Sequence, residues 1–185
     1  MTQVWLVRHG FTTAVSGVAV GSTNPPLSDQ GFDQARRLAR ELASRPLARV
    51  LSSDLERALA TARAIAAPHR LVVDSTTALR EIDFGAWEGR ALADLWHEDP
   101  DMAKAWEVDF RATPSSFGES VADLERRVEG FWTSIEASVA DSEIAVVGHR
   151  GSLAVLRAVI TGESLAAAFA GGLSPAEAVR VEAKA

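Results

Sequence analysis

The sequence has 185 residues, of which 47% are hydrophobic and 24% are charged. This balance is typical of a globular protein and excludes a disordered or fibrous chain. The absence of cysteine excludes disulfides, thiolate zinc sites and a cysteine nucleophile. The 25 acidic and 19 basic residues give a formal net charge of −6, which argues against nucleic acid or an anionic membrane as a partner.

We expect no targeting segment at the N-terminus. Met1 to Gln3 carry no basic side chain and lead directly into a short apolar run, unlike a signal peptide. No stretch approaches the ~20 apolar residues of a membrane span. We therefore expect a cytoplasmic protein that does not contact the membrane, with one domain over residues 1–185, and we allow for a monomer or a homodimer.

Short apolar runs alternate along the chain with amphipathic segments of helical length. The apolar runs predict strands at 4–7, 50–51, 71–73, 144–147 and 178–181. The amphipathic segments predict helices at 28–44, 54–65, 121–139 and 150–160. This alternation predicts an α/β three-layer sandwich, in which helices cover both faces of a mostly parallel central sheet. The less regular stretch at about 84–118 predicts a small, partly helical cap segment over the edge of the sheet.

Polar residues indicate where the helices begin. Ser28 or Asp29 is expected to cap the first helix, whose buried face includes Phe32. Asp54 is expected to cap the second helix in the same way. Residues 120–123 have the spacing of a capping box, in which a serine and an acidic residue three positions later satisfy each other's backbone N–H groups.

Histidines and arginines follow three of the predicted strands. Arg8 and His9 come directly after the first strand, and Arg57 lies one helical turn beyond the second. His149 follows the strand at 144–147. Because open α/β sheets bind ligands at the carboxyl ends of their strands, we expect these side chains to meet. Two guanidiniums and two imidazoles suit a tetrahedral oxyanion such as phosphate, with a carboxylate as the competing ligand.

Five motifs in a fixed order carry a resemblance to a known family. They are LVRHG at 6–10, LSSDLERALATA at 51–62, LREIDFGAWEG at 79–89, GES at 118–120 and VGHRG at 147–151. This ordered set resembles the phosphoglycerate-mutase-like branch of the histidine phosphatase superfamily. The resemblance implies a three-layer α/β fold and phosphoryl transfer through a phosphohistidine.

The resemblance also implies a role for each matching residue. His9 would attack phosphorus through a neutral ring nitrogen, and Glu81 would act as general acid and then as base. Arg8, Arg57 and His149 would hold the non-bridging oxygens and neutralise the developing charge. No metal or other cofactor is implied, because the guanidiniums supply the positive charge. The further phosphate or substrate contacts that we expect are Gly10, Thr12, Ser22, Thr23, Arg150 and Gly151.

Two residues depart from the family pattern. Phe11 stands where an acidic residue is common, and Val15 stands where an asparagine usually helps to bind phosphate. These departures motivate a non-enzymatic alternative, a weakly active relative that binds a phosphorylated ligand as a regulator. Asp83 and Glu88 are rivals for the role of general acid, although the resemblance selects Glu81.

The resemblance implies a small phosphorylated metabolite as the substrate. The chain leaves little room for the insertions of mutases, which favours hydrolysis of a phosphomonoester. The residues after Phe84, together with the GES turn, resemble α-ribazole phosphatases and suggest α-ribazole 5′-phosphate. Sugar-phosphate and phosphoglycerate phosphatases of broad specificity, and enzymes of the phosphoglycerate mutase type, have closely similar spacing and stay open as alternatives.

Overall fold

A computed structural model describes residues 1–98, 100–101, 104 and 117–184. Its centre is a five-stranded sheet with the strand order β3-β2-β4-β1-β5. The four strands on the β3 side of the sheet run parallel, and β5 pairs antiparallel with β1. The strands are β1 (Gln3–Arg8), β2 (Leu47–Ser53), β3 (Val73–Thr76), β4 (Glu143–Gly148) and β5 (Ala178–Glu182).

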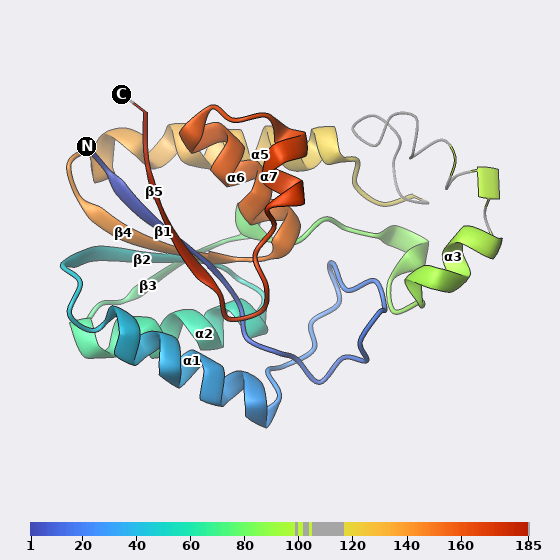
Figure 1. The fold of residues 1–185 in the computed structure, drawn as a ribbon, viewed down its shortest axis with the longest axis horizontal. Helices are drawn as coiled ribbons and strands as arrows, with labels where there is room; N and C mark the ends of the chain where they lie inside the picture. The colour runs from blue at the N-terminus through green and yellow to red at the C-terminus, as the bar shows by residue number, and fades with distance from the viewer. Residues whose placement is uncertain (99, 102–103, 105–116, 185) are drawn as a thin grey trace.

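Helices cover both faces of this sheet (Figure 1). On one face lie α1 (Asp29–Leu42) and α2 (Glu56–Ala66), and on the other α5 (Val121–Ile135), α6 (Arg150–Thr161) and α7 (Leu165–Ala170). The short 3₁₀ helices are η1 (Ala67–His69), η2 (Thr77–Leu79), η3 (Gly85–Trp87) and η4 (Glu136–Val139). The structure therefore confirms the predicted three-layer α/β sandwich with a mostly parallel sheet.

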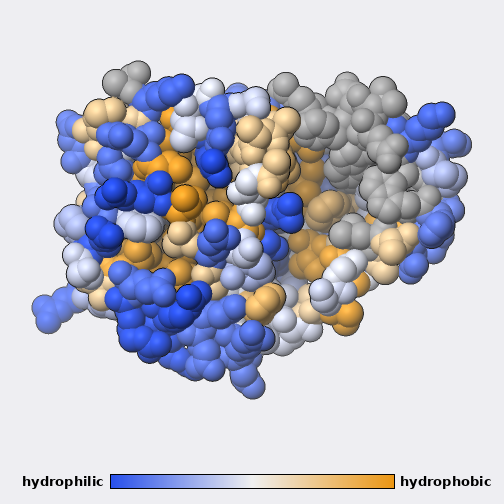
Figure 2. All heavy atoms as spheres, in the orientation of Figure 1, coloured by the Kyte–Doolittle hydropathy of each residue, from blue (hydrophilic) through white to orange (hydrophobic). Residues whose placement is uncertain are grey.

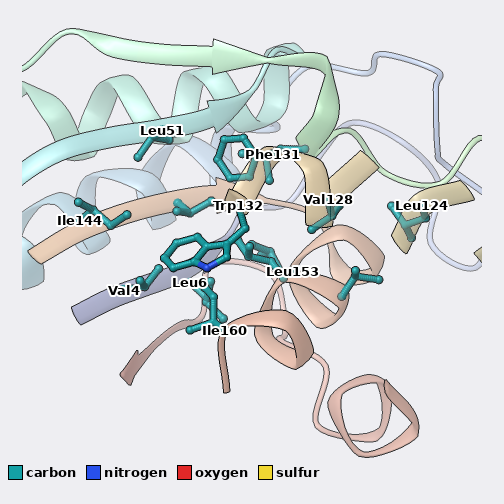
Figure 3. Close-up of a cluster of buried hydrophobic side chains, with 14 of the residues drawn as sticks. Val4, Leu6, Leu51, Leu124, Val128, Phe131, Trp132, Ile144, Leu153 and Ile160 are labelled. Carbon is teal, nitrogen blue, oxygen red and sulfur yellow. The ribbon is translucent and has the colours of Figure 1, made fainter. Parts of the chain in front are cut away.

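The central strands send alternate side chains into two separate cores. Ile144 and Val146 of β4 pack with α5 and α6, whereas Ala145 and Val147 pack with α1 and α2. Figure 3 shows the first of these cores, where Trp132 lies over the sheet. Burial on both faces makes such a strand uniformly apolar, which is why the run at 144–147 predicts a strand correctly.

The first helix begins as expected but presents a different face to the core. The Ser28 side chain accepts a hydrogen bond from the Gly31 N–H and so caps α1. Phe32 is 42% exposed, which contradicts its predicted place on the buried face. Gly31 is buried instead, because its backbone approaches Phe11 so closely that a Cβ would lie 2.0 Å from the Phe11 carbonyl oxygen.

Two further expectations need correction. Asp54 does not cap α2, because its carboxylate accepts two hydrogen bonds from Arg80. The third strand begins at Val73 and not at Leu71. The Leu71 N–H donates to the carbonyl of Ala66, the last residue of α2, and so belongs to the turn between the two elements. Polar side chains then continue β3, because it is an edge strand paired with β2 on one side only.

The expected cap segment at about 84–118 lies partly outside the described residues. Within the described part, α3 (Leu92–Glu98) lies apart from the two helix layers, at the right of Figure 1. Trp87, Leu95 and Ala19 form a small buried cluster there. Among the described residues, no helix is both long and apolar enough to cross a membrane.

Candidate active site

His9 and His149 meet because β1 and β4 are neighbours in register. Arg8 pairs with Gly148, so each histidine follows at the same level of two adjacent parallel strands. Their ring centroids are 5.0 Å apart, with the rings edge to face. β2 lies on the other side of β4 and brings Arg57, one helical turn after its end, to the same edge. The structure thus brings the three strand ends together.

The ring of His9 is held in one tautomer by the backbone carbonyl of the next residue, Gly10. Its Nδ1 lies 2.7 Å from the Gly10 carbonyl oxygen, which can only accept, so Nδ1 carries the proton. The lone pair is therefore on Nε2. Burial is the main cause that lowers the pKa of His9 to about 3, and the charges of Arg57 and Arg8 lower it further. At neutral pH the ring is uncharged, as a nitrogen nucleophile must be.

Gly10 lies where α1 packs against the loop that follows β1. A Cβ on Gly10 would lie only 2.6 Å from the Gly31 carbonyl oxygen. The Gly10 N–H donates to the buried Thr61 hydroxyl at 3.3 Å, and that hydroxyl donates to the Arg57 carbonyl at 2.9 Å. Contact of Gly10 with phosphate stays a prediction. The structure shows that glycine is needed here for the close packing of α1.

Arg57 is a buried cation with three fixed contacts. Its Nη1 and Nη2 donate to the carbonyl oxygens of Thr23 and Gly21, at 2.7 and 2.8 Å, and its Nε donates to Nδ1 of His149 at 3.2 Å. A guanidinium has five N–H groups, so two remain for a ligand. Burial lowers the pKa of Arg57 to about 10, which still leaves the side chain charged at neutral pH.

The His149 ring lies between Arg57 and Ser53 and contacts both. Because its Nδ1 accepts from Arg57, its Nε2 carries the proton and donates to the Ser53 hydroxyl at 2.9 Å. Complete burial lowers the pKa of His149 well below its ordinary value, so the ring is neutral. Both ring nitrogens thus face protein groups in this structure, and a direct contact of His149 with a phosphoryl oxygen stays a prediction.

Arg8 is the second cation of the site. Its Nη1 donates to the Leu173 carbonyl oxygen at 2.8 Å, and its buried Nε has no acceptor among the described residues. Burial lowers the pKa of Arg8, and the nearby Glu81 carboxylate partly offsets this effect. The protein therefore does not saturate the Arg8 guanidinium.

Glu81 lies against the N-terminus of α6. Its two carboxylate oxygens accept from the Gly151 N–H at 3.0 and 3.1 Å. The first N–H groups of a helix have no partner within the helix, so this contact satisfies one of them. A Cβ on Gly151 would lie 2.4 Å from Oε1 of Glu81. Any side chain at position 151 would therefore displace the Glu81 carboxylate from its observed position.

One cavity of about 460 Å³ is lined by the neutral ring of His9 and by four ionisable side chains, Arg8, Arg57, Glu81 and Arg150. His149 lies behind Arg57 and is not part of this lining. Much of the remaining wall is apolar and includes Phe11, Ala14, Val15, Val18, Val20 and Phe84. In Figure 2, hydrophobic side chains gather beside a hollow near the loop between β1 and α1. Thr12 also lines the cavity, and its hydroxyl accepts from the Ala14 N–H at 3.3 Å.

Glu88 anchors the loop that holds Arg57. Its carboxylate accepts from the N–H groups of Gly21, Ser22 and Thr23 and from the Thr23 hydroxyl. Burial raises the pKa of Glu88, but the hydrogen bonds lower it more, so it stays below its ordinary value. Glu88 is thus bound to this loop and lies outside the lining of the cavity that contains His9, whereas Glu81 lines it, which favours Glu81 over Glu88 as the general acid.

The same loop contains two expected substrate contacts. The Thr23 hydroxyl is 2.8 Å from Glu88, and Ser22 lines an adjoining cavity that shares Glu81 with the first. Contact of Ser22 or Thr23 with substrate stays a prediction. Within the part of the chain that the structure describes, no three His, Asp or Glu side chains form a group that could hold a metal ion.

A neutral imidazole in a cationic cavity, with a carboxylate beside it, is the arrangement of an enzyme that attacks an anionic ester. The model of the histidine phosphatase superfamily (branch 1) matches residues 4–185. The chain therefore belongs to this superfamily, and it is a phosphatase.

Several of the proteins that this chain resembles are named as phosphatases. The adenosylcobalamin/α-ribazole phosphatase of Salmonella typhimurium is 38% identical over 155 residues, which cover 83% of this chain and 77% of that protein. The structure of the α-ribazole phosphatase from Shigella flexneri has a TM-score of 0.88 and 31% identity, covering 97% of this chain and 90% of that one. A mycobacterial glucosyl-3-phosphoglycerate phosphatase has a TM-score of 0.85 and 30% identity, covering 96% and 88%.

Proposed function

We propose that this chain hydrolyses a small phosphomonoester through a phosphohistidine on His9, without a metal ion, and that residues 1–185 form one catalytic domain. The observation that carries the proposal is the hydrogen bond from His9 Nδ1 to the Gly10 carbonyl. This bond leaves the lone pair on Nε2, in a cavity that two guanidiniums also line. The arginines would take the part that a metal ion plays in other phosphoryl transfer enzymes.

The reaction would run in two steps at one phosphorus atom. In the first, His9 Nε2 forms a bond to phosphorus while the bond to the ester oxygen breaks, and Glu81 gives its proton to that oxygen. In the second, Glu81 takes a proton from water, the water oxygen attacks phosphorus and the P–N bond breaks. Inorganic phosphate leaves, and the ring and carboxyl return to their starting states.

We further propose that the substrate carries an apolar or aromatic group one sugar ring away from its phosphate, as α-ribazole 5′-phosphate does. The apolar wall of the cavity supports this choice, because Phe11 and Val15 expose 43% and 76% of their surfaces beside the charged end. Exposed apolar side chains at a cavity gain free energy when a ligand covers them. The similarity to α-ribazole phosphatases supports the same substrate.

Substrate preference tests this second proposal. We expect α-ribazole 5′-phosphate to be hydrolysed with a kcat/KM at least 100-fold above that of O-phosphoserine or 3-phosphoglycerate. The Phe11→Ala variant should raise KM for the ribazole substrate and leave KM for phosphoserine unchanged. Phe32→Ala is the matched control, because Phe32 is equally exposed and lies outside the cavity lining. Equal rates on all three substrates would refute the proposed substrate class and leave the chemistry intact.

The metal-independent chemistry has its own test. Hydrolysis of an aryl phosphate should persist in excess chelator and disappear in the His9→Ala variant while the far-ultraviolet spectrum stays that of the folded protein. Activity that is lost to chelator and restored by magnesium would contradict the mechanism. A fully active His9→Ala variant would do the same.

A further inference from the structure

Arg127 of α5 donates hydrogen bonds to the backbone of the segment that carries Glu81. Its Nη1 donates to the carbonyl oxygens of Ala78 and Arg80 at 2.7 and 2.8 Å, and its Nη2 donates to the Glu81 carbonyl at 3.0 Å. These three carbonyls belong to the end of η2 and the irregular chain that follows it. The segment that presents Glu81 is thus held from α5 by one side chain.

Glu119 completes this contact. It accepts from Nε and Nη2 of Arg127 at 2.6 and 2.8 Å, so every N–H of the guanidinium has an acceptor. Both side chains are mostly buried, with exposures of 22% and 18%. The Glu119 N–H also donates to the Asp83 carbonyl at 2.8 Å, which ties the start of α5 to the residues just after Glu81. A saturated, buried, planar ion pair of this kind fixes geometry and leaves no donor for substrate.

Glu81 is therefore fixed from two helices at once. Arg127 of α5 holds its carbonyl oxygen, and Gly151 of α6 holds its carboxylate. A proton donor works only when it lies within hydrogen-bond distance of the leaving oxygen, so a shift of the backbone by a fraction of an ångström weakens the transfer. Neither contact involves the Arg8 or Arg57 guanidinium, and the Gly151 N–H, expected from the sequence to contact substrate, is bound to Glu81 instead.

We propose that Arg127, kept in place by Glu119, is a positioning residue that sets the Glu81 carboxyl against the leaving oxygen of the substrate. This inference rests on the proposed function of Glu81 as general acid. It assigns Glu119 to Arg127 and away from direct contact with the substrate. Loss of Arg127 should then impair proton donation and spare phosphate binding.

A comparison of leaving groups separates these effects. An alkyl phosphate needs a proton on its leaving oxygen, whereas 4-nitrophenolate leaves without one, and kcat/KM for both reports the transfer of phosphate to His9. For Glu81→Gln we expect roughly a 100-fold loss with the alkyl ester and less than fivefold with the aryl ester. Arg127→Gln should show the same imbalance at about tenfold or more, and Arg127→Lys should restore part of the loss. Arg126→Gln is the control, because Arg126 is exposed on the same helix and pairs with Asp123.

Each outcome decides the inference. If Arg127→Gln does not fold by circular dichroism, Arg127→Lys and the milder Glu119→Gln carry the test with the same expected imbalance. Equal losses on both esters would mean that Arg127 serves stability only, and the inference would be wrong. If Glu81→Gln itself shows no imbalance, the proposed acid fails, which is a different result from failure of Arg127 alone.

Discussion

The Nε atom of Arg57 donates to Nδ1 of His149 across 3.2 Å, and this contact fixes both side chains. It sets the tautomer of the histidine, whose Nε2 then donates to Ser53. It also orients the guanidinium, whose other fixed donors bind the carbonyls of Gly21 and Thr23. The buried His149 imidazole thus orients the Arg57 guanidinium, and the carbonyls of the loop at 21–23 hold the other two nitrogens of that guanidinium.

This relationship predicts that charge alone cannot replace Arg57. A lysine at this position keeps the charge but has one ammonium in place of a planar fork, so it cannot reach His149 and two carbonyls together. Arg57→Lys should lower kcat/KM for an aryl phosphate by about 10²–10³-fold, the usual cost of a lost transition-state donor. Steady-state kinetics measure the loss.

The matched control lies on the same helix. Arg63 of α2 is 60% exposed at its side chain and pairs with Glu56 at 3.3 Å. Arg63→Lys should change kcat/KM less than twofold, because exposed ion pairs contribute little. Similar losses in the two variants would contradict the special place of Arg57.

Glycine at position 151 should be required for proton transfer. In Gly151→Ala the new Cβ would lie 2.4 Å from the Glu81 carboxylate, so the carboxylate must move. We expect kcat/KM for an alkyl phosphate to fall at least tenfold while the protein stays folded, because a flexible side chain and not the backbone is displaced. The same assay on 4-nitrophenyl phosphate should show a much smaller change.

Gly130→Ala is the control for the substitution itself. Apart from its two chain neighbours and the backbone of α5 itself, a Cβ on Gly130 would have no heavy atom within 4 Å, and Gly130 is exposed inside α5. Alanine there should stabilise the protein by about 0.5–1 kcal/mol through helix propensity and leave activity unchanged. If Gly151→Ala keeps its kcat/KM for the alkyl phosphate, proton transfer does not require the Glu81 carboxylate to lie against the Gly151 N–H.

Burial of His9 makes stability depend on pH in a defined window. Its pKa is about 3 in the folded protein and about 6.5 in the unfolded chain, so the unfolded chain binds more protons between these values. The contribution is fully present above pH 6.5 and is lost as the pH falls toward 3. Lowering the pH from 7.5 to 4.5 should cost the wild type on the order of 2–3 kcal/mol more than His9→Asn, as denaturant unfolding would measure. A parallel pH dependence of the two proteins would contradict the low pKa.

The convergence of the arginines and histidines could be predicted because the carboxyl ends of parallel strands lie at one edge of a sheet. Arg8, His9 and His149 directly follow two buried strands, and apolar runs locate such strands well. Ser28 and the capping box at 120–123 could be predicted for a similar reason, because their partners lie within three residues. A short sequence pattern therefore predicts a contact well when both partners lie within that pattern.

Contacts between distant segments could not be predicted. The carboxylate of Asp54 goes to Arg80 and that of Glu88 to the loop at 21–23, and no local pattern indicates either partner. Phe32 has helical spacing for the core, but the close approach of Gly31 to the backbone turns it outward. For Arg127 the sequence contains one indication. This charged residue is next to the buried face of α5, which includes Leu124 and Val128, and a charged side chain at such a position needs a partner.

Direct detection of the phosphorylated enzyme tests the central claim. The enzyme is mixed with labelled aryl phosphate, quenched in alkali within milliseconds, digested and sequenced by mass spectrometry. The mechanism predicts up to one phosphoryl group per chain, on His9, stable to alkali and lost in acid. The Glu81→Gln variant should accumulate it, because its second step lacks a base. Rapid turnover with no phosphate on His9, or with phosphate on another residue, would contradict the account.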